Sequence, residues 1–181
     1  MKKLLTAMVL GCFLAVGVQA HALSITPGGA VMTGDQTAQP AIDSAIASTL
    51  GLSVELYKQN VGGAESGILA GSYETLFFDT PTDPSGATIT YTGGDILGDM
   101  KFLLVKDGNQ NPAWYLFNLT TLGWDGVETL ELSAFWPAGG AISHVTLYGS
   151  SSPPAVPEPG TLLLLGGGLL GLAVYGRRRM K

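Results

Sequence analysis

Asp107, Asn109 and Asn111 place side-chain oxygens at alternate positions, the spacing with which a calcium-binding loop begins. Such a loop also needs a glycine for its sharp turn and an acidic residue that closes the shell with both oxygens. Here Pro112 stands at the glycine position and Asn118 at the position of the closing acid. An Asp-Gly hairpin turn therefore explains these residues better. A calcium site remains an alternative if acids from other loops join it, namely Asp79, Asp83, Asp95 and Asp99.

Aromatic side chains offer a second candidate chemistry, stacking on sugar rings, through Trp114, Trp124, Trp136, Tyr115 and Tyr148. The same rings serve a protein core equally well, because each buries a large apolar area. Trp114 and Trp136 alternate with aliphatic residues in predicted strands, which favours core positions. Trp124 precedes an Asp-Gly pair in a predicted turn. If any of the three tryptophans is exposed for ligand binding, we expect it to be Trp124.

Catalytic chemistry has little support in the residue types. Cys12 is the sole cysteine, and it lies with His21 in a predicted export signal, so His144 is the one histidine left in the body of the chain. A histidine base needs a nucleophile, and no G-x-S-x-G elbow is present. No spacing singles out two carboxylates for glycoside hydrolysis. We therefore assign no catalytic residue, no metal ligand and no cofactor, with calcium as the alternative.

The N-terminal residues have the pattern of a secretory signal. Two lysines precede an apolar run from Leu4 to Val18, and Ala20-His21-Ala22 is a cleavage site of the A-x-A type. We predict a signal-peptide helix within residues 1–22 and removal by signal peptidase. A mature chain without cysteine must be held together by packing, since it has no disulfide.

The body of the chain, residues 23–149, is predicted to form one extracellular domain. Between residues 23 and 155 it carries thirteen acidic residues against three lysines, a net charge of −10. Such a surface repels nucleic acid and anionic lipid, so we expect no nucleic-acid partner. It is compatible with calcium or with a neutral extracellular polysaccharide.

Residue periodicity predicts a mainly β fold with one short N-terminal helix. The helix spans Thr37 to Gly51, with Pro40 early, apolar residues at helical spacing and a terminal glycine, and it should cover an edge or a face of a sheet. Seven strands follow between Gly- and Pro-containing turns, at 52–58, 71–78, 87–91, 100–105, 113–119, 129–136 and 141–148. That spacing favours an antiparallel β-sandwich, jelly-roll-like in form.

The last residues combine three features in a fixed order. A Ser/Pro linker at 150–156 is followed by Pro157, Glu158 and Pro159, whose prolines favour extended backbone. An uncharged apolar run follows from Thr161, shorter than the roughly 20 residues of a full membrane span. Arg177, Arg178 and Arg179 then orient this predicted transmembrane helix, with the domain outside.

This tail, residues 157–181, closely resembles the PEP-CTERM sorting domain of exported bacterial proteins. The resemblance implies recognition of the Pro-Glu-Pro motif by exosortase, a membrane transpeptidase-like enzyme. It also implies an inner-membrane-anchored precursor that is later released to the cell surface or an extracellular polysaccharide matrix. Residues 101–149 are in addition similar to a domain type that such proteins commonly carry, which implies a structural surface module.

Three functions follow as hypotheses. The favoured one is a non-enzymatic module, exported, processed by exosortase and acting in a surface layer or biofilm matrix. The second is a carbohydrate- or calcium-binding module that uses Trp124, Asp107 and Asn109. The third is a secreted glycan hydrolase with acidic catalysts.

Overall fold

The structure is a computed structural model that describes residues 22–51, 55–78 and 84–152. The predicted signal helix before residue 22 and the predicted tail helix after Thr161 lie outside these residues. No helix of the described part is long and apolar enough to cross a membrane.

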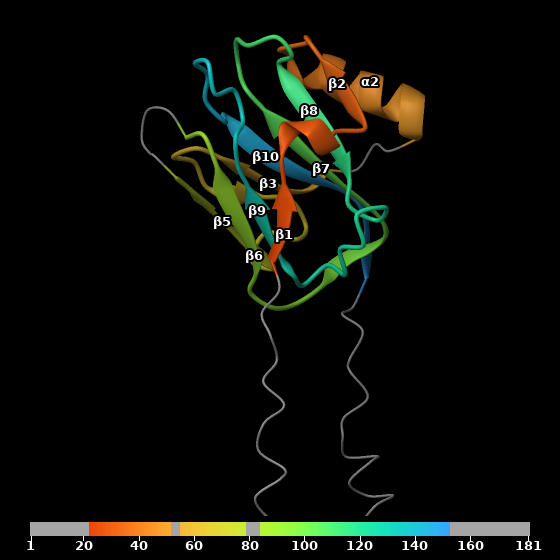
Figure 1. Ribbon diagram of the computed structural model, residues 1–181. Helices are drawn as coiled ribbons and strands as arrows, with labels where there is room; N and C mark the ends of the chain where they lie inside the picture. The colour runs from red at the N-terminus through yellow and green to blue at the C-terminus, as the bar shows by residue number, and fades with distance from the viewer. Residues whose placement is uncertain (1–21, 52–54, 79–83, 153–181) are drawn as a thin grey trace, which may run out of the picture.

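The described chain folds into two β-sheets and one α-helix (Figure 1). In the four-stranded sheet the spatial order is β1 (Ala22–Ile25), β9 (Thr129–Leu132), β6 (Ala87–Tyr91) and β5 (Tyr73–Phe77). In the six-stranded sheet it is β2 (Met32–Gly34), β8 (Trp114–Asn118), β7 (Ile96–Lys106), β10 (His144–Ser152), β3 (Glu55–Asn60) and β4 (Glu65–Ser66). A 3-10 turn, η2 (Pro27–Gly29), connects β1 to β2, and the helix α2 (Gln39–Leu50) connects β2 to β3.

Alternation along the two central strands of the larger sheet builds the main core. Leu103 and Val105 of β7 lie opposite Leu147 and Val145 of β10, and all four side chains are fully buried on one face. They belong to one apolar cluster with residues of the smaller sheet, including Ile89, Leu130 and Leu132. The two sheets are therefore packed face to face as a sandwich.

The helix α2 covers the other face of the six-stranded sheet. Its Ile42 and Ile46, four residues apart, are fully buried in a second apolar cluster with Leu104, Trp114 and Tyr148 of the sheet. Polar contacts fix the helix as well, since the Tyr148 hydroxyl donates to Asp43 Oδ1 at 2.8 Å. The helix ends at Gly51, which adopts the left-handed conformation (φ 69°) expected of a C-terminal glycine.

These observations confirm the mainly β fold with one short helix, and each of the seven predicted strands overlaps an observed one. Among the described strands β1 and β9 run parallel, and the sheets hold four and six strands. Both features distinguish this sandwich from a regular eight-stranded jelly roll. The structure also corrects the predicted linker, which was expected to begin at residue 150. β10 continues through Ser152, which pairs with Ile96.

The two ends of the described domain lie at one end of the molecule. The start of β1 and the end of β10 are both at the bottom of Figure 1. The turn between β7 and β8 is at the opposite end, because β7 has eleven residues and spans about 35 Å. We call these the exit end and the distal end.

Candidate functional site

Asp107 sits at the distal end, where β7 turns into β8, and it is buried. Its Oδ1 accepts a hydrogen bond of 2.7 Å from the Asn109 backbone N–H. Its Oδ2 accepts one of 2.6 Å from the Ala141 N–H, in the segment that leads to β10. The predicted hairpin turn is confirmed, and the carboxylate also ties this turn to a second loop.

Asn109 is exposed on the same turn. Its backbone N–H serves the turn through Asp107. In the described residues no group of three His, Cys, Asp or Glu side chains converges as a metal site would require. Both oxygens of Asp107 are already engaged by backbone N–H groups, so a cation at this turn would have to compete with those bonds.

Trp124 lies in the core and not on the surface, so the tryptophan chosen as the candidate for exposure is buried. Its side chain is 2% exposed, and its indole N–H donates to the Glu128 carbonyl oxygen at 2.6 Å. The centroid of its ring is 6.0 Å from the ring centroid of Tyr73. Because neither ring face is open, Trp124 is not available to stack on a sugar.

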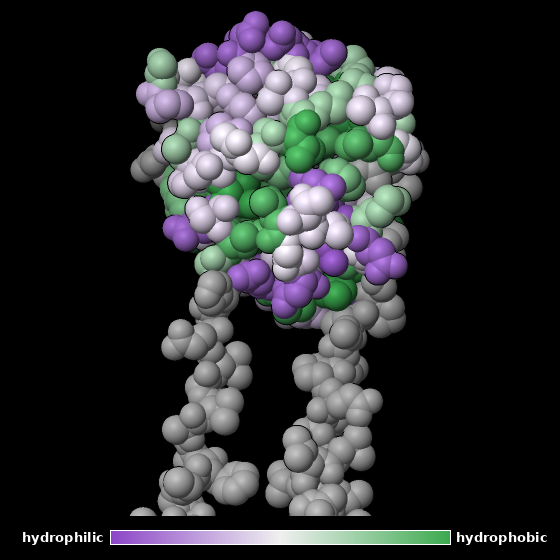
Figure 2. All heavy atoms as spheres, turned by 45° about the vertical axis from the view of Figure 1, so that its right-hand side comes forward, coloured by the Kyte–Doolittle hydropathy of each residue, from purple (hydrophilic) through white to green (hydrophobic). Residues whose placement is uncertain are grey.

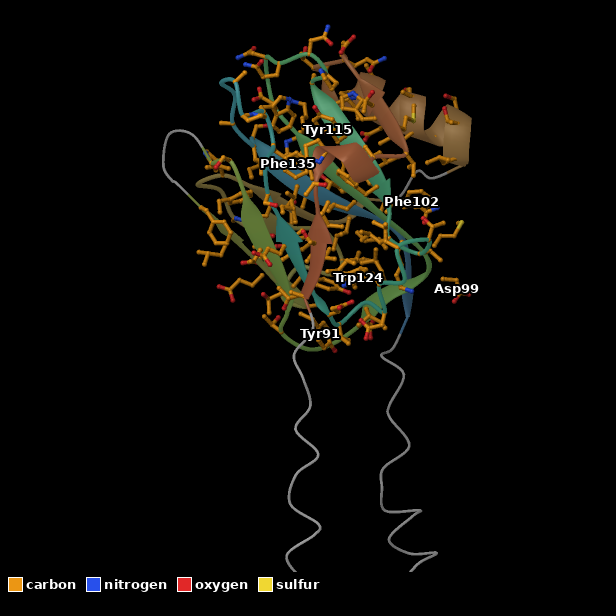
Figure 3. The ribbon with its side chains drawn as sticks, viewed as in Figure 1. Tyr91, Asp99, Phe102, Tyr115, Trp124 and Phe135 are labelled. Atoms are coloured by element: carbon orange, nitrogen blue, oxygen red, sulfur yellow. The ribbon has the colours of Figure 1, made fainter. Side chains whose placement is uncertain are left out.

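Trp114 and Trp136 are also buried, but only Trp114 lies on a strand, because β9 ends at Leu132 before the predicted strand position of Trp136. The Trp136 indole donates to the Pro112 carbonyl oxygen at 2.9 Å, and its ring packs 5.3 Å from Tyr115 and 5.7 Å from Phe135. Tyr115 and Phe135 lie together in Figure 3, toward the distal end. Trp136 has a positive φ of 46°, a conformation that non-glycine residues rarely adopt. This aromatic cluster holds the distal loops in place.

His144 is the first residue of β10 and is buried between two neighbouring strands. Lys106 of β7 and Asn60 of β3 lie directly opposite it. Burial is the main reason why its pKa falls from the usual 6.5 to about 3, and the charges of Lys58 and Lys106 lower the pKa further. The imidazole is therefore neutral at neutral pH.

The surroundings of His144 suit a structural role better than catalysis. Its Nδ1 lies 3.4 Å from Ser143 Oγ, but that hydroxyl donates to the Lys106 carbonyl oxygen at 3.1 Å. An efficient general base has a pKa near the working pH, and a histidine with a pKa of about 3 lies far below it. The Ser143–His144 neighbourhood is thus poorly suited to activate a nucleophile.

Three exposed apolar residues at the exit end escaped the sequence analysis: Met100, Leu122 and Val127. Leu122 and Val127 fall in loops beside Gly and Asp residues, where periodicity carries no signal. Met100 lies inside β7, where it and Asp99 are both exposed, so strict alternation of buried and exposed residues fails at this point of the strand.

The predicted sorting residues lie outside the described part of the chain: Pro157, Glu158, Pro159, Arg177, Arg178 and Arg179. What the geometry defines is a β-sandwich whose last strand leads, after Ser152, directly into this tail. A family model described as the PEP-CTERM protein-sorting motif matches residues 155–179, so the chain carries this motif and the predicted resemblance is confirmed. No curated protein and no solved structure matched the chain.

The motif implies exosortase as a processing partner and an exported, membrane-anchored precursor.

Proposed function

We propose that this chain is an exported precursor which exosortase processes at the Pro157-Glu158-Pro159 motif, and that its β-sandwich then acts without catalysis in a surface layer or extracellular matrix. The observation that carries the proposal is the motif match at residues 155–179. Signal peptidase removes residues 1–22 in this scheme, and an extracellular polysaccharide is the surrounding medium.

The candidate side chains already make contacts within the fold, and this supports a non-enzymatic domain. Asp107 uses both carboxylate oxygens on backbone N–H groups, Trp124 packs in the core, and His144 is neutral and enclosed. Each of these residues stabilises the fold. The exposed loops and sheet faces then make the contacts with the matrix.

The test is the intact mass of protein extracted from the surface of producing cells. The parent chain should lack the residues that follow the Pro-Glu-Pro motif, and its mass also reveals any group attached in their place. A variant with Pro157→Ala, Glu158→Ala and Pro159→Ala should keep its tail and stay in the membrane fraction. Trimming and release of this variant like the parent would contradict the proposal.

A further inference from the structure

The last strand of the domain ends very close to the sorting motif. β10 pairs with β7 through Ser152, whose partner is Ile96. Only residues 153–156 separate Ser152 from Pro157. A fully extended chain advances at most about 3.6 Å per residue, so the Cα atoms of Ser152 and Pro157 are at most about 18 Å apart.

This short reach has a steric consequence. A folded domain of only about 100 residues already has a radius of gyration of about 13 Å. An enzyme that encloses Pro157-Glu158-Pro159 in its cleft therefore contacts the exit end of the β-sandwich. The surface around Ser152 must tolerate that contact or contribute to it.

Three side chains of this surface are both apolar and well exposed. Met100 is 53% exposed, Leu122 40% and Val127 41%. We call these three residues the exit patch. Figure 2 shows hydrophobic and hydrophilic residues interspersed near the end of the molecule from which the chain leaves.

Backbone contacts place the exit patch around the end of β10. The hydroxyl of Thr120 bridges the two neighbours of Met100, because it donates to the Asp99 carbonyl oxygen at 3.0 Å and accepts from the Lys101 N–H at 3.1 Å. Leu122 follows in the same turn as Thr120, with its N–H bonded to the Asn118 carbonyl oxygen.

Val127 belongs to the neighbouring turn. The adjacent Gly126 packs so closely on Ile96 that an added Cβ would lie 3.3 Å from its side chain. Ile96 is in turn the strand partner of Ser152. The turn with Val127 therefore borders the point at which the chain leaves the domain, and the turn with Leu122 lies beside Lys101, whose strand partner Gly149 is three residues before Ser152.

We propose that the exit patch is a docking surface for the exosortase that processes the tail, an inference that rests on the proposed function. The exposed Asp99 and Asp125 border the patch, so the enzyme face that fits it is apolar with a basic or neutral rim. The same two acids disfavour an anionic bilayer as the occupant, because like charges repel. Docking holds the motif at the cleft and raises its effective concentration there.

The test follows the full-length precursor in producing cells that contain the enzyme. Pulse-labelled chains are sampled over time, and the processed fraction is measured by intact mass. The triple variant Met100→Ser, Leu122→Ser, Val127→Ser should be processed about three- to tenfold more slowly than the parent, because it loses apolar contact area. The matched control is the double variant Ile68→Ser, Leu76→Ser, which removes two apolar side chains from β5 and the turn before it. These side chains are more exposed than those of the exit patch (69% and 63%), and the double variant should be processed at the parental rate.

A longer spacer separates docking from other effects. Ten Gly/Ser residues inserted between Ser152 and Pro153 let the enzyme reach the motif without touching the domain, so the parent and the triple variant should then be processed equally fast. Parental processing of the triple variant with the native spacer would overturn the inference, as would a difference that persists with the long spacer. Equal melting temperatures of the variants show that the fold is intact. A parent that is not processed at all would instead contradict the proposed function.

Discussion

His144 shows how burial decides the role of a titratable residue. Taken alone, a histidine beside a serine suggests a base and a nucleophile. In the fold, the imidazole is enclosed between Lys106 on one strand and Asn60 on the other, with Lys58 nearby. Protonation would place a third positive charge in a buried region, so the neutral form is strongly preferred.

This preference predicts a specific dependence of stability on pH. In the unfolded chain His144 takes up a proton near its usual pKa of 6.5, whereas in the folded protein it does so only near pH 3. Since the unfolded state binds more protons between these values, His144 contributes stability above pH 6.5 that is lost as the pH falls toward 3. The free energy of unfolding should therefore decline by up to about 1.4 kcal/mol per pH unit from this residue alone.

Urea unfolding of the parent and of His144→Gln at pH 7, 6, 5 and 4 measures this contribution. The stability difference, parent minus variant, should shrink with each step toward acid, while the carboxylates contribute equally to both proteins. Parallel stability curves for the two proteins would show that His144 is not held neutral.

The aromatic and acidic residues show what a sequence reveals at this scale. Strand alternation correctly placed Trp114 in the core, because a period of two reports which face of a strand is buried. Trp136 is also buried, but β9 ends at Leu132, so Trp136 lies in the following loop and its predicted strand position was wrong. Trp124 has no such period, since it sits in a loop, and its burial depends on Tyr73, a residue distant in sequence, and on a local hydrogen bond to Glu128. For Asp107, the Asp-Gly pair predicted the turn but could not reveal the bond to Ala141, 34 residues further along.

At the scale of elements, the pairing of β7 with β10 organises the molecule. These two strands lie at the centre of the larger sheet, with β8 and β3 on either side. Their register shifts between Gly149 and Ser151, next to the exit end. Gly149 has a φ of 149°, and a Cβ at this position would overlap the carbonyl oxygen of Met100. A glycine is therefore required where the two backbones approach.

Replacing this glycine should be costly. We expect Gly149→Ala to lower the free energy of unfolding by about 2–4 kcal/mol, because the new methyl group forces β7 and β10 apart in a strained backbone conformation. Gly108→Ala is the matched control, since a Cβ there meets no atom within 4 Å and its φ is not positive. Urea denaturation of both variants measures the difference. Equal stability of the two variants would contradict the close approach.

The elements divide clearly into those that the sequence predicts and those that it does not. Long alternating or helical runs predicted α2 and seven strands, because their own periodicity shows the buried face. β1, β2 and β4 have four, three and two residues, too few for a period to emerge. They are strands only because β9, β8 and β3 offer them hydrogen-bonding partners. The end of β10 is a similar case, since a serine run reads as a linker until Ile96 pairs with it.

At the scale of the whole molecule, the two ends of the β-sandwich differ in their distance from the sorting tail. The chain leaves for its membrane tail at the exit end, and the turn with Asp107 and Asn109 lies about 35 Å away along β7. In an anchored precursor the chain between Ser152 and Pro157 reaches at most about 18 Å, so we expect the exit end to face the membrane and its enzyme and the distal loops to face away from them. An anchored precursor should therefore present its two ends to solvent very differently.

Cysteine labelling of the full chain tests this orientation. Cys12 is the only native cysteine, so Cys12→Ser provides a background for single cysteines at Asn109→Cys or Val127→Cys, both at exposed positions. In the membrane-anchored precursor a bulky maleimide polymer should modify position 109 several-fold faster than position 127, because at most about 18 Å of chain separates Ser152 from the membrane-proximal motif. In the released protein the two positions should react at similar rates, which controls for intrinsic reactivity. Equal rates in the precursor would mean that the exit end stands clear of the membrane and its enzyme, and that the four-residue spacer does not bring them together.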